Sequence, residues 1–91
     1  MDLNSILIEG RLIGDPTMEG ETGECRFLME SESREGPCEL AVVTRSRLAE
    51  SCFGYLKSDR TVRVVGRIAM VREALCIVAE HVEFRPAARV A

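Results

Sequence analysis

The fold of this chain is decided by the stretch NSILIEGRLIGDP, residues 4–16. Its apolar, β-branched run predicts a strand over Leu3–Gly14. Gly10 inside that run indicates a bulge or a sharp bend, as at the corner of a barrel. Asp15-Pro16 predicts the end of the strand, because proline cannot donate to a central ladder and restricts the residue before it.

The remaining chain reads as four more strands, one helix and short connections. Residues Asp15–Gly23 are polar, contain two glycines and a proline, and predict a loop. Alternating apolar residues mark the later strands. The predicted strands are Glu24–Ser33, Cys38–Arg45, Thr61–Met70 and Ala74–Phe84, and the predicted turns are Arg34–Pro37 and Val71–Glu73.

The predicted helix follows the third strand, with Ser46 as its N-cap. Apolar residues recur there at helical spacing and are expected to face the core: Leu48, Ala49, Cys52, Phe53 and Leu56. The order β-β-β-α-β-β, with the helix between strands three and four, is that of the five-stranded OB-fold, a Greek-key barrel. We expect one such domain over residues 1–86 and a frayed tail over residues 87–91.

Length and composition suit a single folded domain, since 46% of the 91 residues are hydrophobic. No apolar run approaches the ~18 residues that a membrane span requires. The N-terminus carries Asp2 in place of the basic segment of a signal peptide. We therefore expect a cytoplasmic protein that does not enter a membrane.

The residues that most often bind metals are isolated in this sequence. Cys25, Cys38, Cys52 and Cys76 form no C-x-x-C pair, and the single histidine, His81, has no partner at helical spacing. The cysteines are expected to be small buried hydrophobes in a reducing compartment, without a disulfide, a metal or a cofactor.

The charge is acidic overall and unevenly distributed. Fifteen acids outnumber twelve bases, which gives a net charge of −3, and the acids concentrate in the first half while bases dominate residues 40–91. All the bases except Lys57 are arginine, which suits bidentate contacts with phosphate. A solvated surface explains the same residues equally well, so both interpretations stay open.

Residues 4–16 resemble the opening of the bacterial single-stranded-DNA-binding protein (SSB) family, Asn-x-Val/Ile-x-Leu/Ile-x-Gly-x-Leu followed by Asp-Pro. Later segments resemble the same family: Cys25–Met29, Leu48–Glu50, Tyr55–Lys57, Val62–Ile68 and Leu75–Phe84. The resemblance implies an OB-fold protein that binds single-stranded DNA without catalysis, in replication, recombination or repair. The short chain is also similar to primosomal replication protein N, a short, tailless, dimeric OB-fold factor of replication restart.

The chain departs from the SSB pattern at the residues that stack on bases. SSB proteins use several aromatic side chains, mostly tryptophan, and this chain has no tryptophan. The family's stacking positions fall on Cys38 and Thr44 and near Arg34 and Val71, none of which is aromatic. The aromatic residues present are expected to pack instead of stacking. They are Phe27, Phe53 and Phe84 on core faces and Tyr55 on the helix.

The candidate nucleic-acid contacts are basic residues on the fourth strand and on the rims of the barrel. They are Arg11, Arg34, Arg45, Lys57, Arg63, Arg67 and Arg72. Arg63 and Arg67 are expected to share one face of their strand. Binding through such residues, without stacking, is expected to be weak and dependent on salt.

The first strand is the expected subunit interface of a homodimer or homotetramer. The resemblance implies that this strand pairs antiparallel with its copy, with contacts at Asn4, Ser5, Leu7 and Glu9. Such pairing would cover an apolar edge that is a liability when exposed. A second surface, Leu40 and Val42, corresponds to the face of the family that meets DNA. Because it is aliphatic here, we expect it to contact replication or repair proteins.

Four functions remain open on the sequence. The first is an SSB-type protein, and the second is a restart factor like primosomal replication protein N. The third is a degenerate OB-fold that binds proteins and no longer binds DNA, which the acidic balance and the missing aromatics favour. The fourth, an enzyme, has no support, because no paired-carboxylate, nucleophile-base, phosphate-loop or metal pattern is present, so no catalytic residue is assigned.

Overall fold

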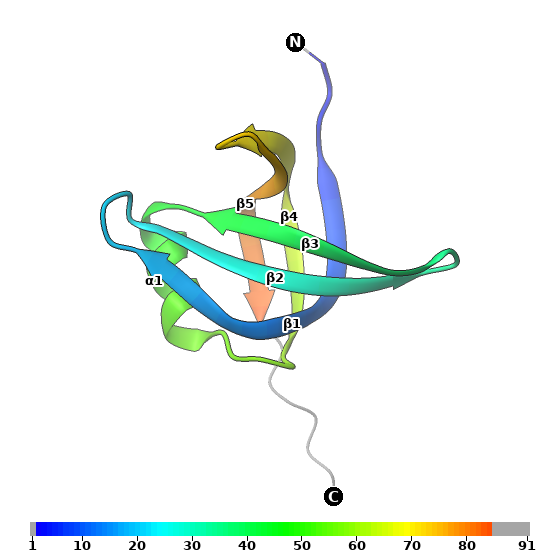
Figure 1. Ribbon diagram of the computed structural model, residues 1–91, viewed down its shortest axis with the longest axis horizontal. Helices are drawn as coiled ribbons and strands as arrows, with labels where there is room; N and C mark the ends of the chain where they lie inside the picture. Colours follow the sequence, from blue (N-terminus) through cyan, green and yellow to red (C-terminus); the bar gives the residue numbers. More distant parts are fainter. Residues whose placement is uncertain (1, 85–91) are drawn as a thin grey trace, which may run out of the picture.

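The computed structural model describes residues 2–84, which form a closed five-stranded barrel with one helix (Figure 1). The elements are β1 (Ile6–Glu19), β2 (Glu24–Ser33), β3 (Gly36–Thr44), α1 (Ser46–Tyr55), β4 (Thr61–Val71) and β5 (Ala74–Phe84). The strand order around the barrel is β1-β2-β3-β5-β4, in which only the β3–β5 pair is parallel. The predicted OB-fold is confirmed. The predicted tail over residues 87–91 lies outside the described residues.

The barrel closes because β1 pairs with two different strands. Its first half, from Ile6 to Arg11, pairs with β4, and its second half, from Arg11 onward, pairs with β2. The strand bends between these halves, where a Cβ at Gly10 would overlap the carbonyl oxygen of Glu30. The corner predicted at Gly10 is therefore present, and it requires a residue without a side chain.

The predicted loop at Asp15–Gly23 is wrong, because β1 continues through Asp15-Pro16 to Glu19. The ladder with β2 is irregular between Ile13 and Thr17. Proline is tolerated at such a bulge, where the backbone N–H that it lacks is not needed for a ladder hydrogen bond. The β1–β2 connection is therefore a tight turn at residues 20–23.

The barrel interior confirms the alternation predicted for β2 and β4. Cys25, Phe27 and Met29 point inward from β2, and Val62 and Val64 point inward from β4. The helix closes one end of this core with two buried residues, Ala49 and Cys52, and its C-cap residue Leu56 is buried beside them. Among the described residues no helix is long and apolar enough to cross a membrane.

Three local predictions are wrong. Phe53 is 50% exposed because the helix turns that residue away from the barrel. The residue at the N-cap is Arg45, and Ser46 is the first residue of the helix. Cys38 is exposed on β3, while the other three cysteines are buried and all four are free.

A second, smaller apolar cluster lies outside the barrel. It consists of Val43, Cys76 and Val78, with the half-buried Ala41, Ala69 and Val71 packed against them. The β4–β5 hairpin curls back above β3 and makes this cluster possible (Figure 1). Its two-residue turn, Arg72–Glu73, has positive φ angles of 50° and 65°, as the mirror-image turns of tight hairpins require.

We expect Gly10→Ala to lower the free energy of unfolding by about 3 kcal/mol, because the added methyl group overlaps backbone that cannot move freely. Gly66→Ala should behave similarly, since its Cβ would overlap the carbonyl oxygen of Val78. The control is Gly54→Ala, a helical position with open space around it, which should gain about 0.5–1 kcal/mol. Urea unfolding measures all three, and equal effects at the three positions would contradict the explanation.

The buried Cys52 thiol makes stability fall in alkaline solution. Burial raises the pKa of Cys52 from 9.0 to about 12, so between these values the unfolded chain loses a proton that the folded chain keeps. The contribution of this thiol to the free energy of unfolding is therefore fully present below pH 9 and is lost progressively above it. At about pH 10.5 the loss due to this thiol is about 2 kcal/mol.

This loss is measured as the difference in unfolding free energy between the wild type and Cys52→Ala. That difference should shrink by about 2 kcal/mol between about pH 8 and pH 10.5. Cys38→Ala, which removes an exposed thiol, is the matched control. A constant difference between wild type and Cys52→Ala would show that the buried thiol does not titrate as described.

Candidate nucleic-acid interface

Four of the seven predicted contact residues are held in ion pairs within the chain. These pairs are Arg11–Glu30 at 3.3 Å, Arg45–Glu24 at 3.0 Å, Arg63–Glu9 at 3.0 Å and Arg72–Glu19 at 2.7 Å. Within residues 2–84 the other three, Arg34, Lys57 and Arg67, have no ion pair. The acids that the sequence places in the first half thus neutralise more than half of the predicted site.

The structure does not bring the seven residues together on one face. Arg34 lies in the β2–β3 turn, and Lys57 lies in the connection between α1 and β4. Arg63 and Arg67 share the outer face of β4 as predicted, but Arg63 lies between Glu9 and Glu83. A strand of nucleic acid on any one face would therefore meet only part of the set.

The outer face of β1, β2 and β3 carries a shallow groove of about 250 Å³. Ile13, Leu28 and Ala41 form one row across its three strands, as the ladder registers require. This is the face on which OB-folds bind oligonucleotides. The aromatic residue that contributes to the groove, Phe27, is buried in the core. The groove is thus apolar but offers bases no exposed ring.

A cluster of charged residues lies at one end of this groove, between the β1–β2 turn and the β4–β5 turn. Arg72 donates to Glu19 at 2.7 Å and to Glu24 at 2.9 Å, and Arg45 donates to Glu24 at 3.0 Å. The hydrogen bond from Arg72 lowers the pKa of Glu19 below its ordinary value of 4.5, and the same bond raises the pKa of Arg72. We call Arg26, Arg45, Arg72, Glu19 and Glu24 the arginine cluster.

Sequence reasoning did not identify Arg26, Glu19 or Glu24. Glu19 was placed in a loop, and its distance from Arg72 in the sequence is 53 residues. The only signal that brings these residues together is the topology of the barrel, which sets the β4–β5 turn beside the β1–β2 turn. No local pattern carries that information.

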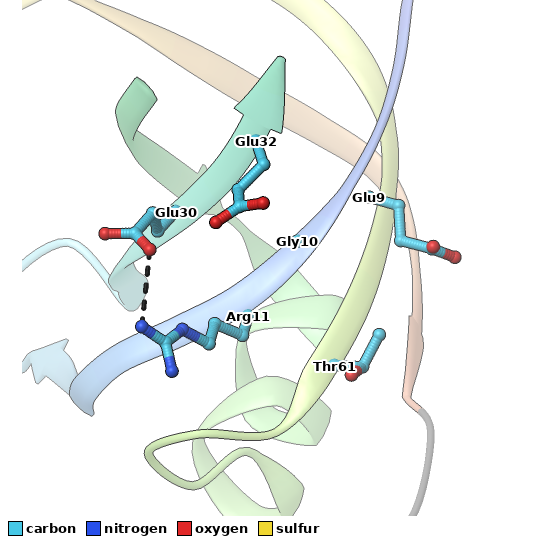
Figure 2. Close-up of a pocket in the computed structure, with 6 residues that line it drawn as sticks. All are labelled: Glu9, Gly10, Arg11, Glu30, Glu32 and Thr61. Carbon is cyan, nitrogen blue, oxygen red and sulfur yellow. Dashed lines mark hydrogen bonds and ion pairs between the residues drawn. The ribbon is translucent and has the colours of Figure 1, made fainter. Parts of the chain in front are cut away.

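A second opening, shown in Figure 2, lies where β1 and β2 separate beyond the corner. It has a volume of about 560 Å³ and is lined by Glu9, Gly10, Arg11, Glu30, Glu32 and Thr61. Arg11 reaches back to Glu30, and Glu32 lies beside them on β2 (Figure 2). Arg63 neutralises Glu9 and Arg11 neutralises Glu30, which leaves the negative charge of Glu32, so this opening is unfavourable for phosphate. Residues 2–84 contain no cluster of ligands suited to a metal ion.

Comparison with solved structures identifies the same barrel in proteins that bind single-stranded DNA. The small single-stranded DNA-binding protein of Streptomyces coelicolor matches with a TM-score of 0.82, 19% identity and 99% coverage of both chains. The chain has an SSB-like OB-fold. The second single-stranded DNA-binding protein, SSBb, of Mycobacterium smegmatis matches with a TM-score of 0.77, 23% identity and 97% coverage of both chains.

The dimeric N-terminal domain of the PriB protein of Thermoanaerobacter tencongensis is similar to the SSB-like barrel as well. Its TM-score is 0.76 at 17% identity, over 91% of this chain and 97% of that domain. No protein-family model matches the sequence, and no curated protein does. At these identities the similarity establishes the fold.

The SSB-like barrel corrects the prediction for Leu40 and Val42. Val42 is fully buried in the core, and Leu40 is half-buried against it, because the residues of β3 that alternate outward are Ala41 and Val43. Val42 is therefore not part of a contact surface. Leu40 lines a different groove of about 240 Å³, together with Ile6, Ile68 and Leu75.

The predicted interface residues lie on the first half of β1 in the SSB-like barrel. Leu7 is 68% exposed and lies opposite Val65 of β4, while Glu9 binds Arg63. The Asn4 side chain extends the strand by donating to the carbonyl of Ile68 at 2.7 Å and accepting from its N–H at 2.9 Å. Ser5 is exposed. Asn4 therefore already has a role within its own subunit.

Proposed function

We propose that this protein binds single-stranded DNA without catalysing a reaction and acts in DNA replication, recombination or repair in the cytoplasm. The observation that carries the proposal is the match of the whole barrel, over 99% of both chains, with a protein that binds single-stranded DNA. The groove across β1, β2 and β3 supports it, since it lies where OB-folds receive oligonucleotides.

Binding is proposed to be weak and driven by phosphate contacts. Each base stacked on an aromatic side chain contributes ~1–3 kcal/mol, and the groove presents no exposed ring for this purpose. The free energy must then come mainly from the release of counterions by arginine and lysine. Among the predicted contacts, Arg34, Lys57 and Arg67 are the side chains that meet phosphate without first breaking an ion pair of residues 2–84.

We expect Arg34→Ala and Arg67→Ala each to reduce the slope of log affinity against log salt by roughly 0.7, the value for one phosphate contact on a single strand. Fluorescence anisotropy of a labelled oligo-dT at several salt concentrations measures the slope. Arg47→Ala removes an exposed arginine outside the predicted site and is the control. If all variants have the same slope as the wild type, neither Arg34 nor Arg67 contacts phosphate. If the wild type does not bind oligo-dT at low salt, the proposed function is wrong.

A second candidate function is a protein-interaction module. It is favoured by the apolar groove beside the β4–β5 hairpin, where Ile68, Met70 and Leu75 are exposed. Contiguous exposed apolar residues often mark contacts with other proteins. The same anisotropy titration separates the two, because a module that has lost DNA binding gives no signal at any salt concentration.

We propose further that the protein is a homodimer, or a tetramer built from two dimers, through the first half of β1. From Ile6 to Ile8 this strand pairs with β4 on one side, and no strand within residues 2–84 pairs with the other edge of this segment. Antiparallel pairing with a second copy would satisfy those backbone groups and cover Leu7. The dimer would carry two linked binding sites, and one DNA strand that spans both sites would bind with an avidity ~10²–10⁴-fold higher than the affinity of one site.

Leu7→Lys is expected to dissociate the dimer and to weaken binding to long oligonucleotides far more than to short ones. Leu75→Lys is a matched control, because Leu7 and Leu75 are both leucines with 68% exposure on different surfaces. Light scattering at tens of micromolar measures the mass. A monomeric wild type, or dissociation by Leu75→Lys alone, would contradict the proposed interface.

A further inference from the structure

The β4–β5 hairpin covers part of the face on which OB-folds bind nucleic acid. Val43 points outward from β3, yet it is only 1% exposed, because Cys76 and Val78 pack against it together with Ala69 and Val71. Figure 1 shows the hairpin lying above β3 at the top of the view. The tip of the hairpin, residues 69–76, lies beyond the β3–β5 ladder pairs Val42–Ile77 and Val43–Val78, and it thus forms a strap over the outer side of β3.

The tip of the strap is fastened to the β1–β2 turn by a single guanidinium. Arg72 Nη1 binds Glu19 Oε1 at 2.7 Å, and Nη2 binds Glu24 Oε1 at 2.9 Å. These carboxylates flank the turn on its two sides. Glu24 is itself buried and also accepts from Arg45 Nε at 3.0 Å. Both turns are therefore tied together through charged hydrogen bonds.

Arg26 lies beneath this fastening with hydrogen-bonding groups that are not satisfied. The ladder registers place it beside Thr17 on one side and Val43 on the other, in the outer row that the strap covers. Its Nε and Nη2 are buried and have no acceptor within residues 2–84. The nearest carboxylate oxygen, Glu19 Oε1, is 3.8 Å from Nε, which is too far for a hydrogen bond.

The arginine cluster therefore has more positive charge than its own acids neutralise. Three guanidinium groups share two carboxylates, and Nε and Nη2 of Arg26 have no hydrogen-bond acceptor among the residues that the structure describes. Buried donors of this kind require an acceptor, and an anion with several oxygens fits guanidinium groups best. A phosphate group has the charge and the geometry that the cluster lacks.

We propose that Arg26, Arg45 and Arg72 form a phosphate-binding site that Glu19 and Glu24 hold closed, with the β4–β5 hairpin as a self-inhibitory strap. The ligand is the phosphodiester backbone of a single strand, so the inference rests on the proposed function. Phosphates displace the two carboxylates, the strap lifts, and Val43 and the buried Nε and Nη2 groups of Arg26 become accessible.

The charge of the two carboxylates is tested by Glu19→Gln combined with Glu24→Gln, which keeps side-chain size and removes both negative charges. Oligo-dT should bind roughly tenfold more tightly at low salt, and the salt slope should steepen by about 2, or roughly 0.7 for each arginine released to phosphate. Glu21→Gln with Glu32→Gln changes the net charge equally outside the cluster and is the control. A folded double variant with unchanged or weaker binding, or an equal gain in the control, would overturn the proposal.

The movement of the strap is tested without DNA through Cys76, a residue of the hairpin whose buried side chain packs against Val43, in a Cys38→Ala background that removes the exposed thiol. Arg72→Ala should raise the rate of Cys76 alkylation roughly tenfold and leave Cys25 and Cys52, inside the barrel, unchanged. Arg47→Ala, which removes an exposed arginine of α1, is the control. Mass spectrometry of peptides assigns each thiol, and an unchanged Cys76 rate would show that no strap is held by Arg72.

Adding oligo-dT to this alkylation assay separates failure of the strap from failure of the proposed function. If the phosphates open the strap, DNA accelerates alkylation of Cys76 in the Cys38→Ala protein. If the protein does not bind DNA, the oligonucleotide has no effect while Arg72→Ala still accelerates the reaction, which refutes the proposed function and the assigned ligand. If DNA binds by anisotropy but does not accelerate alkylation, the strap proposal alone is refuted.

Discussion

The whole architecture depends on the bend of β1 at Gly10. One strand serves two neighbours, and it can do so only because the backbone of Glu30 approaches Gly10 more closely than a side chain allows. The bend closes the barrel, which removes most sheet edges from a small domain. It also separates β1 from β2 on one side, where the acidic opening forms, and holds them together on the other, where the apolar groove forms.

Ion pairs between arginines and carboxylates dominate the electrostatics of the outer surface. An exposed ion pair contributes about 0–1 kcal/mol, so pairs such as Arg11–Glu30 yield readily to another anion. Glu24 differs because it is buried and binds two guanidinium groups at once. A net charge of −3 is therefore compatible with phosphate binding, since the relevant quantity is how easily each arginine exchanges its internal partner.

The fold could be predicted from the sequence to the extent that local alternation determines it. The inward faces of β2 and β4, the helix and the corner at Gly10 follow from periodicity and backbone chemistry. The continuation of β1 through Asp15-Pro16 could not be predicted from the sequence, because a bulge is visible only in the pairing with the neighbouring strand. The same limit applies to Val42, whose inward direction depends on the register of β3, and to Phe53, whose exposure depends on how α1 is rotated against the barrel.

The arginine cluster was beyond sequence reasoning because its members meet only after the hairpin folds over β3. That folding stabilises the closed form by burying Val43 and Val78 outside the barrel. The closed form then opposes the ligand, and the apparent affinity equals the intrinsic affinity reduced by the fraction of open molecules. The loss is compensated in part by the surface that opening uncovers. Val43, the ladder neighbour of Arg26, is the aliphatic side chain that lifting of the hairpin tip exposes, and a base can pack on it where the chain provides no aromatic ring. A protein without tryptophan can in this way combine phosphate contacts with apolar contacts, and it exposes this side chain only while a strand occupies the site.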